Sequence, residues 1–165
     1  MLVPTNQMEE VLRVLAERKL TLAVAEGDTG GLLLQRLTTI PGSSAVVLGG
    51  VVAYADALKC ELLNVSAELL SEHGAVSAEA ASAMAIGVRA VARADIGLAT
   101  TGIAGPGGAT PTKPVGLAYV AAVYGEHALV REYHWHGDRR ANRESSAVAA
   151  IALLEDLLRE KFMTP

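Results

Sequence analysis

The chain has 165 residues, 51% hydrophobic and 4% aromatic, with a formal net charge of −4 at pH 7. This length suits one domain, residues 1–165, and the acidic balance without a Lys/Arg cluster argues against nucleic-acid binding. The single cysteine, Cys60, excludes an internal disulfide, and we find neither a signal peptide nor an apolar run of membrane-spanning length, so we expect a cytoplasmic protein without membrane contact.

Apolar residues at helical spacing predict a first helix over residues 7–19. An apolar strand from Thr21 to Ala25 follows, then a turn from Glu26 to Gly31 and a helix from Thr29 that ends before Pro41. The later elements are a strand at 44–54, helices at 56–63, 66–72 and 77–92, a strand at 95–100, a hairpin of strands at 115–124 and 127–136, and a last helix to about residue 161. This order of strands and helices predicts one α/β domain with a mixed sheet.

The turn after the first strand is a candidate site. Where a strand feeds a helix in an open α/β sheet, the first N–H groups of the helix are unpaired and face a crevice. Asp28 can accept from the N–H groups of Gly30 or Gly31, or these donors can hold a phosphate, which a fixed carboxylate would oppose. No Ser or Cys lies at the centre of the turn, where a nucleophile elbow presents one. An ordinary N-cap with close-packing glycines explains the local sequence at least as well.

Two further segments are candidates. A lysine in a partly buried pocket loses proton affinity and can serve as a general base, a role open to Lys59 with Tyr54 beside it. The alternative is a solvated Lys59 and a rim Tyr54, which the segment alone favours because most lysines are exposed. The loop from Thr101 to Gly108 follows an apolar strand, and its glycines allow close backbone approach to a ligand. We therefore prefer a binding role to a plain turn for this loop.

The histidines do not predict a metal site. His134 and His136 alternate along the last predicted strand, but neither they nor His73 have an acidic or histidine partner at ligand spacing. Asp138 and the arginines after it are interpreted as a helix cap with solvated charges, although an arginine there can reach a phosphate.

Taken together, these segments resemble the C-terminal domain of the CinA family, the nicotinamide-nucleotide amidohydrolases. The combination of Glu26-x-x-Thr29-Gly30-Gly31 with Gly102-Ile103-Ala104-Gly105-Pro106 is specific, and the resemblance covers nearly the whole chain. Further matches, in family order, are residues 41–44, Tyr54 with Lys59, 73–77, 113–116 and 137–139. The resemblance implies a single three-layer α/β/α domain with a mixed, mostly parallel sheet, without the larger N-terminal domain of full-length members.

The resemblance also implies an activity: hydrolysis of the carboxamide of nicotinamide mononucleotide to nicotinate mononucleotide and ammonia. It implies a serine nucleophile, a lysine base, no metal or cofactor, and a homodimer. Lys59 and Tyr54 match the family, but Gly27 occupies the serine position and Asp28 the position of the next cysteine. The implied substrate-binding residues are Asp28, Thr29, Gly30, Gly31, Ser43, Thr101, Gly102, Ile103, Ala104, Gly105 and Arg139.

An acyl-enzyme cannot form without an atom to acylate, so we expect a binding or regulatory protein with lost or strongly reduced activity. One alternative is a working amidohydrolase, on nicotinamide mononucleotide or another amide, in which Lys59 activates water or the hydroxyl of Ser43 or Thr101. A third interpretation keeps hydrolysis but changes the substrate, with Asp28 contacting a cationic or neutral group in place of phosphate.

Overall fold

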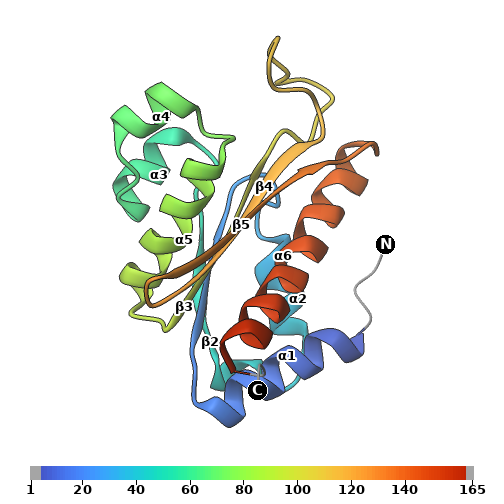
Figure 1. Cartoon of the computed structure of the whole chain (residues 1–165). Coiled ribbons are helices and arrows are strands. Elements are labelled where there is room, and N and C mark those ends of the chain that lie inside the picture. Colours follow the sequence, from blue (N-terminus) through green and yellow to red (C-terminus); the bar gives the residue numbers. More distant parts are fainter. Residues whose placement is uncertain (1–4, 163–165) are drawn as a thin grey trace.

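Six α-helices, one 3₁₀ turn and five strands make up the part of the chain that the structure, a computed structural model, describes, residues 5–162 (Figure 1). In chain order these are α1 (Thr5–Arg18), β1 (Leu22–Glu26), α2 (Leu32–Thr39), η1 (Ser43–Ala45), β2 (Val47–Val52), α3 (Asp56–Leu63), α4 (Ala67–His73), α5 (Ala78–Ala92), β3 (Ile96–Gly102), β4 (Leu117–Tyr124), β5 (His127–His134) and α6 (Arg139–Phe162). The predicted caps are confirmed, because the hydroxyls of Ser66 and Ser77 accept the N–H groups of Leu69 and Ala80 at 3.1 Å.

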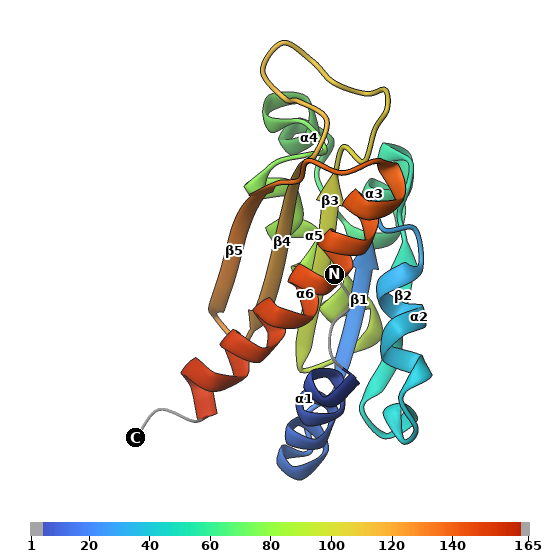
Figure 2. The ribbon, with the colours of Figure 1, turned by 90° about the vertical axis from the view of Figure 1, so that its right-hand side faces the viewer.

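The strands form one open sheet in the order β2-β1-β3-β4-β5. Strands β2 and β3 pair with β1 in parallel, whereas β4 pairs with β3, and β5 with β4, in antiparallel fashion. Helices α3, α4 and α5 cover one face and α1, α2 and α6 the other, which confirms the predicted three-layer α/β fold with a mixed sheet (Figure 1 and Figure 2). The carboxyl ends of β1, β2 and β3 therefore lie at the same edge of the sheet.

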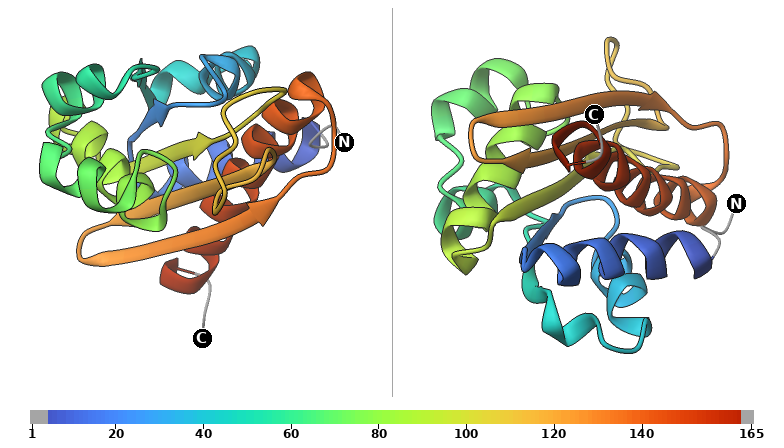
Figure 3. Two further views of the ribbon diagram at one scale, coloured as in Figure 1. Left: turned by 90° about the horizontal axis from the view of Figure 1, so that it is seen from above. Right: turned by 60° about the horizontal axis from the view of Figure 1, so that its bottom comes forward.

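The central strands alternate between two cores. In β1, Leu22 and Val24 pack toward α1, α2 and α6, whereas Ala23 and Ala25 pack toward α5. Helix α5 lies very close to β3: a Cβ built on Gly97 would fall 1.9 Å from the carbonyl oxygen of Ala85. Figure 3 shows the helical layers on the two sides of the sheet from above and from below. Small residues on the α5 side thus permit a close approach of helix and sheet.

Several predicted boundaries are wrong. The strand predicted at 44–54 begins only at Val47, because Gly42, at φ 85°, leads into the 3₁₀ turn η1. The helix predicted from Thr29 begins at Leu32, and β5 ends at His134, two residues earlier than predicted. Within residues 5–162, none of the helices combines the length and the apolar character needed to cross a bilayer.

Candidate functional site

A cavity of about 240 Å³ opens at the carboxyl ends of β1, β2 and β3. This is where ligands bind in open α/β sheets. The cavity brings together the turn after β1, the start of α3, the connection between α4 and α5, the glycine-rich loop after β3 and the first residue of α6. Its lining residues are Gly27, Asp28, Tyr54, Asp56, Lys59, Ala75, Val76, Thr101, Gly102, Ile103, Ala104, Gly105, Gly107, Gly108 and Arg139. Ten of these 15 residues are among the candidate site residues of the sequence analysis.

Glu26, the last residue of β1, organises the turn that follows it. Its carboxylate is 1% exposed and accepts from the backbone N–H groups of Gly31, Leu33 and Leu34 at 2.9–3.0 Å. It also accepts from the hydroxyl of Thr29 at 2.6 Å. A buried carboxylate with this many donors stabilises the positive end of the helix dipole. Glu26 is therefore the cap of α2.

The prediction that Asp28 caps this helix is wrong, and so is the phosphate site at its first turn. Glu26 occupies the N–H groups, and the N–H of Leu32 donates to the carbonyl oxygen of Thr29 at 3.2 Å. No free donor of that first turn is left to face an anion. Thr29 is fully buried, and residues 29–31, which were predicted to bind substrate, do not line the cavity. Their role in this structure is to build the turn.

Asp28 lies in the cavity wall in an unfavourable environment for a carboxylate. It is 7% exposed, and its Oδ1 has no hydrogen-bond partner. Its Oδ2 lies against Gly102, 2.9 Å from the position of a Cβ built there. Burial raises the pKa of Asp28, and the nearby charge of Glu26 acts in the same direction, while the hydroxyls of Ser146 and Thr100 oppose it.

Gly27 lines the centre of the site and has no side chain. Its N–H donates to the carbonyl oxygen of Thr100 at 2.9 Å. A Cβ built on Gly27 would lie 3.1 Å from that oxygen and 3.6 Å from the hydroxyl of Thr101. The hydroxyl of Thr101 donates to the carbonyl oxygen of Ala75 at 2.7 Å. A serine thus fits at position 27 with a small shift of its neighbours, and Thr101 supplies a hydroxyl close to that position.

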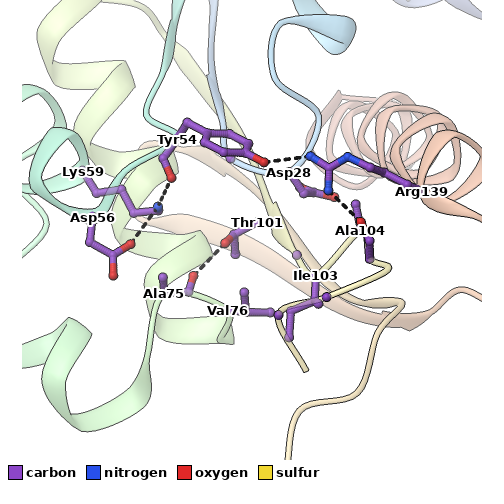
Figure 4. Close-up of a pocket in the computed structure, with 15 residues that line it drawn as sticks. Asp28, Tyr54, Asp56, Lys59, Ala75, Val76, Thr101, Ile103, Ala104 and Arg139 are labelled. Atoms are coloured by element: carbon purple, nitrogen blue, oxygen red, sulfur yellow. Dashed lines mark hydrogen bonds and ion pairs between the residues drawn. The ribbon is translucent and has the colours of Figure 1, made fainter. Parts of the chain in front are cut away.

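Lys59 is buried in the cavity wall at 3% exposure, contrary to the solvated position that its local sequence favoured. Its Nζ lies 3.1 Å from Oδ1 of Asp56 and 3.4 Å from the carbonyl oxygen of Tyr54. In Figure 4, Lys59 and Asp56 lie on one side of Thr101, and Asp28 lies on the other. Asp56 was not among the residues expected in the site, although its spacing of three residues from Lys59 on a helix is a known signal for an ion pair.

The start of α6 holds the glycine-rich loop and the turn in place. Arg139 donates to the carbonyl oxygen of Gly105 and to the hydroxyl of Tyr54, both at 2.8 Å (Figure 4). Asn142 donates to the carbonyl oxygen of Ala104 at 3.0 Å. Arg143 donates to the backbone carbonyl oxygens of residues 28 and 29, at 3.2 and 2.7 Å. Neither Asn142 nor Arg143 was predicted, because nothing in the sequence relates α6 to these loops.

Ser43 is the one predicted site residue that lies far from the cavity. It begins η1, before the first residue of β2. The cavity lies beyond the other end of that strand. Because parallel strands run in one direction, the two ends of β2 are separated by the length of the strand. Ser43 therefore cannot supply a hydroxyl to this site.

The chain is similar to a known protein family along most of its length. The family model described as the CinA C-terminal domain matches residues 5–158. A CinA-like protein of Syntrophus aciditrophicus is 50% identical over 149 residues, which are 90% of this chain and 36% of that protein. The CinA-like protein of Thermotoga maritima is 44% identical over 158 residues, 95% of this chain and 38% of that protein. The chain thus spans little more than a third of the length of these relatives.

Solved structures show the same fold. The competence/damage inducible protein CihA from Agrobacterium tumefaciens superposes with a TM-score of 0.91 at 35% identity, covering 95% of this chain and 98% of that chain. The competence damage-inducible protein A (ComA) from Klebsiella pneumoniae gives 0.92 at 32% identity, with the same coverage.

Proposed function

Since this chain belongs to the CinA C-terminal domain family, we propose that it binds a nicotinamide nucleotide in the cavity and has lost most or all of the amidohydrolase activity that the family resemblance implies. The observation that carries the proposal is Gly27. It lines the same cavity as Lys59 and Tyr54, the implied partners of the nucleophile, but brings no oxygen to it. The binding surface is thus retained while the atom that would be acylated is missing.

The loss of the nucleophile should outweigh what the rest of the site retains. In a serine hydrolase, removal of the nucleophile lowers kcat by about 10⁶, and the residual activity comes from binding and oxyanion stabilisation. Ser43, one of the two hydroxyls suggested as substitutes, lies beyond the other end of β2. Thr29 is fully buried and donates to Glu26. Neither can replace the serine.

Ammonia release from nicotinamide mononucleotide tests the proposal. We expect no release above background from the wild-type protein and measurable release from a Gly27→Ser, Asp28→Cys double variant. The matched control is Gly27→Ala, Asp28→Cys, which has the same Cβ at position 27 and lacks only the hydroxyl. Release by the wild-type protein at the rate of the serine variant would contradict the proposal, and so would equal rates in the serine and alanine variants.

The second candidate is direct hydrolysis with Thr101 or a water as nucleophile, favoured by one observation. The Thr101 hydroxyl lies 3.6 Å from the position of a Cβ at Gly27, and Lys59 is buried in the same cavity. In this reaction Lys59 takes the proton of water or of Thr101 as that oxygen bonds to the amide carbon, and it passes the proton to the nitrogen as the C–N bond breaks and ammonia leaves. On the threonine route, water then hydrolyses the ester formed on Thr101 and releases the acid. It predicts wild-type activity that Lys59→Met abolishes. Thr101→Val then separates the two nucleophiles, because it stops the threonine route only.

A further inference from the structure

We infer that Asp28 makes this cavity selective for an uncharged group that donates N–H hydrogen bonds, such as a primary carboxamide, over a carboxylate. The inference rests on the proposed function, because it concerns the ligand of the same cavity. It names what the nucleotide must present at the wall formed by Gly27 and Asp28. On this basis the protein binds the amide nucleotide and rejects the corresponding acid.

The cavity wall contains a hydrogen-bond acceptor without a partner. Asp28 lines the cavity, is 7% exposed, and has an Oδ1 without a hydrogen-bond partner. Buried polar atoms are nearly always paired, so an unpaired one next to a cavity points to a ligand that completes it. A carboxyl oxygen accepts hydrogen bonds. Because Gly27 and Asp28 both line the cavity, we expect a ligand whose carboxamide lies against Gly27 to bring an N–H donor close to this carboxyl group.

The negative charges at this wall disfavour a ligand carboxylate. Glu26 is buried beside it, and the environment already disfavours the negative charge of Asp28 itself. A ligand carboxylate would add a further negative charge at the same wall, where low solvent exposure leaves it poorly screened. The carboxamide differs from the carboxylate by little more than this charge, so the penalty falls on the acid alone.

The side chains of the nearby cations already have other partners in the protein. Lys59 is paired with Asp56, and Arg139 donates to Gly105 and to Tyr54. Arg143 reaches the backbone carbonyl oxygen of residue 28 and not its carboxylate. Within residues 5–162, Asp28 forms no ion pair. The carboxyl group thus keeps its effect on the ligand.

Titration calorimetry with nicotinamide mononucleotide and nicotinate mononucleotide, at neutral pH, tests the inference. We expect the wild-type protein to bind the amide at least about tenfold more tightly than the acid. Asp28→Asn should reduce this ratio to within about threefold, chiefly by strengthening the binding of the acid. The matched control is Glu61→Gln, which removes the same charge from an exposed position on α3 outside the cavity. It should leave the ratio unchanged.

The outcomes separate this inference from the proposed function. If neither nucleotide binds the wild-type protein, the proposed function fails and the inference falls with it. If both bind equally well, nucleotide binding stands and the selectivity is refuted. A preference that survives in Asp28→Asn, or one that disappears equally in Glu61→Gln, overturns the role of Asp28. Chromatography of the nucleotide after each titration verifies that it was not hydrolysed.

Discussion

Replacing Asp28 with asparagine should stabilise the protein at neutral pH. The Asp28 side chain is 7% exposed, its Oδ1 has no partner, and burial raises its pKa. A buried polar group without a partner costs about 1–3 kcal/mol, and more if it is charged. Asparagine has nearly the same shape and no charge at any pH. We therefore expect the free energy of unfolding at neutral pH to rise by about 1–2 kcal/mol, which is about 2–8 °C in Tm for a chain of this size.

The stability that Asp28→Asn adds should increase as the pH rises. The pKa of Asp28 is raised in the folded state, whereas an unfolded aspartate has a pKa of about 3.9. Below about 3.9 the carboxyl group is protonated in both states, so wild type and variant should be almost equally stable. As the pH rises from there through the folded pKa, the wild type loses the stability that the protonated side chain supplies. The difference between the two proteins should widen over this range and then stay constant.

Urea unfolding followed by circular dichroism between about pH 4 and pH 8 measures this difference. Glu61→Gln is the control for loss of one negative charge, because Glu61 is exposed. A variant that is less stable than the wild type at neutral pH would refute the reasoning. The same holds for a gain that is equally large at both ends of the pH range, since such a gain could not come from a carboxyl group that ionises.

Three further substitutions test the packing and the turn. Gly97→Ala should lower the free energy of unfolding by about 1–3 kcal/mol, because its Cβ would lie 1.9 Å from the carbonyl oxygen of Ala85. The control is Gly107→Ala, whose Cβ would have no atom within 4 Å and which should change the free energy of unfolding by less than about 0.5 kcal/mol. Equal effects of the two substitutions in urea unfolding would contradict this prediction. Glu26→Gln turns an amide donor toward N–H groups that need an acceptor, so it should lower the free energy of unfolding by about 2 kcal/mol. An unchanged urea midpoint would show that this cap does not stabilise the protein. Arg143→Met should weaken nucleotide binding about tenfold in calorimetry, because it frees two carbonyl oxygens of the turn, and unaltered affinity would show that the turn needs no such support.

The fold could be predicted from the sequence because it depends on local patterns, and the same patterns indicated a place for the candidate site. Apolar runs, the capping serines Ser66 and Ser77 and the glycines after β1 and β3 marked the elements and their order. Ligands gather at the carboxyl ends of parallel strands, and that rule alone brings Gly27, Lys59 and Thr101 to one edge of the sheet. A cavity lined by these three residues opens at that edge.

The residue that caps α2 could not be predicted from the sequence, because the cap depends on which side chain reaches the N–H groups of the first turn. Capping rules assign the cap to a residue next to the first helical turn, which made Asp28 the candidate. Glu26 lies farther back, at the end of β1, but its longer side chain passes under the turn and takes the N–H groups. Asp28 therefore does not cap the helix, and its Oδ1 has no hydrogen-bond partner. A single wrong cap therefore concealed the most unusual feature of the site.

The two departures from the family pattern should also act together on catalysis. If a serine at position 27 attacks an amide, negative charge develops on the carbonyl oxygen at the wall where Asp28 and Glu26 are already buried, and a nearby carboxylate opposes that charge. Gly27→Ser alone should therefore recover at least about tenfold less activity than Gly27→Ser with Asp28→Cys. The steric demand of the serine, with its Cβ 3.1 Å from the carbonyl oxygen of Thr100, is the same in both variants and cancels in the comparison. Steady-state ammonia release gives both values of kcat, and equal values would show that Asp28 has no part in the proposed loss of activity, which would then depend on Gly27 alone.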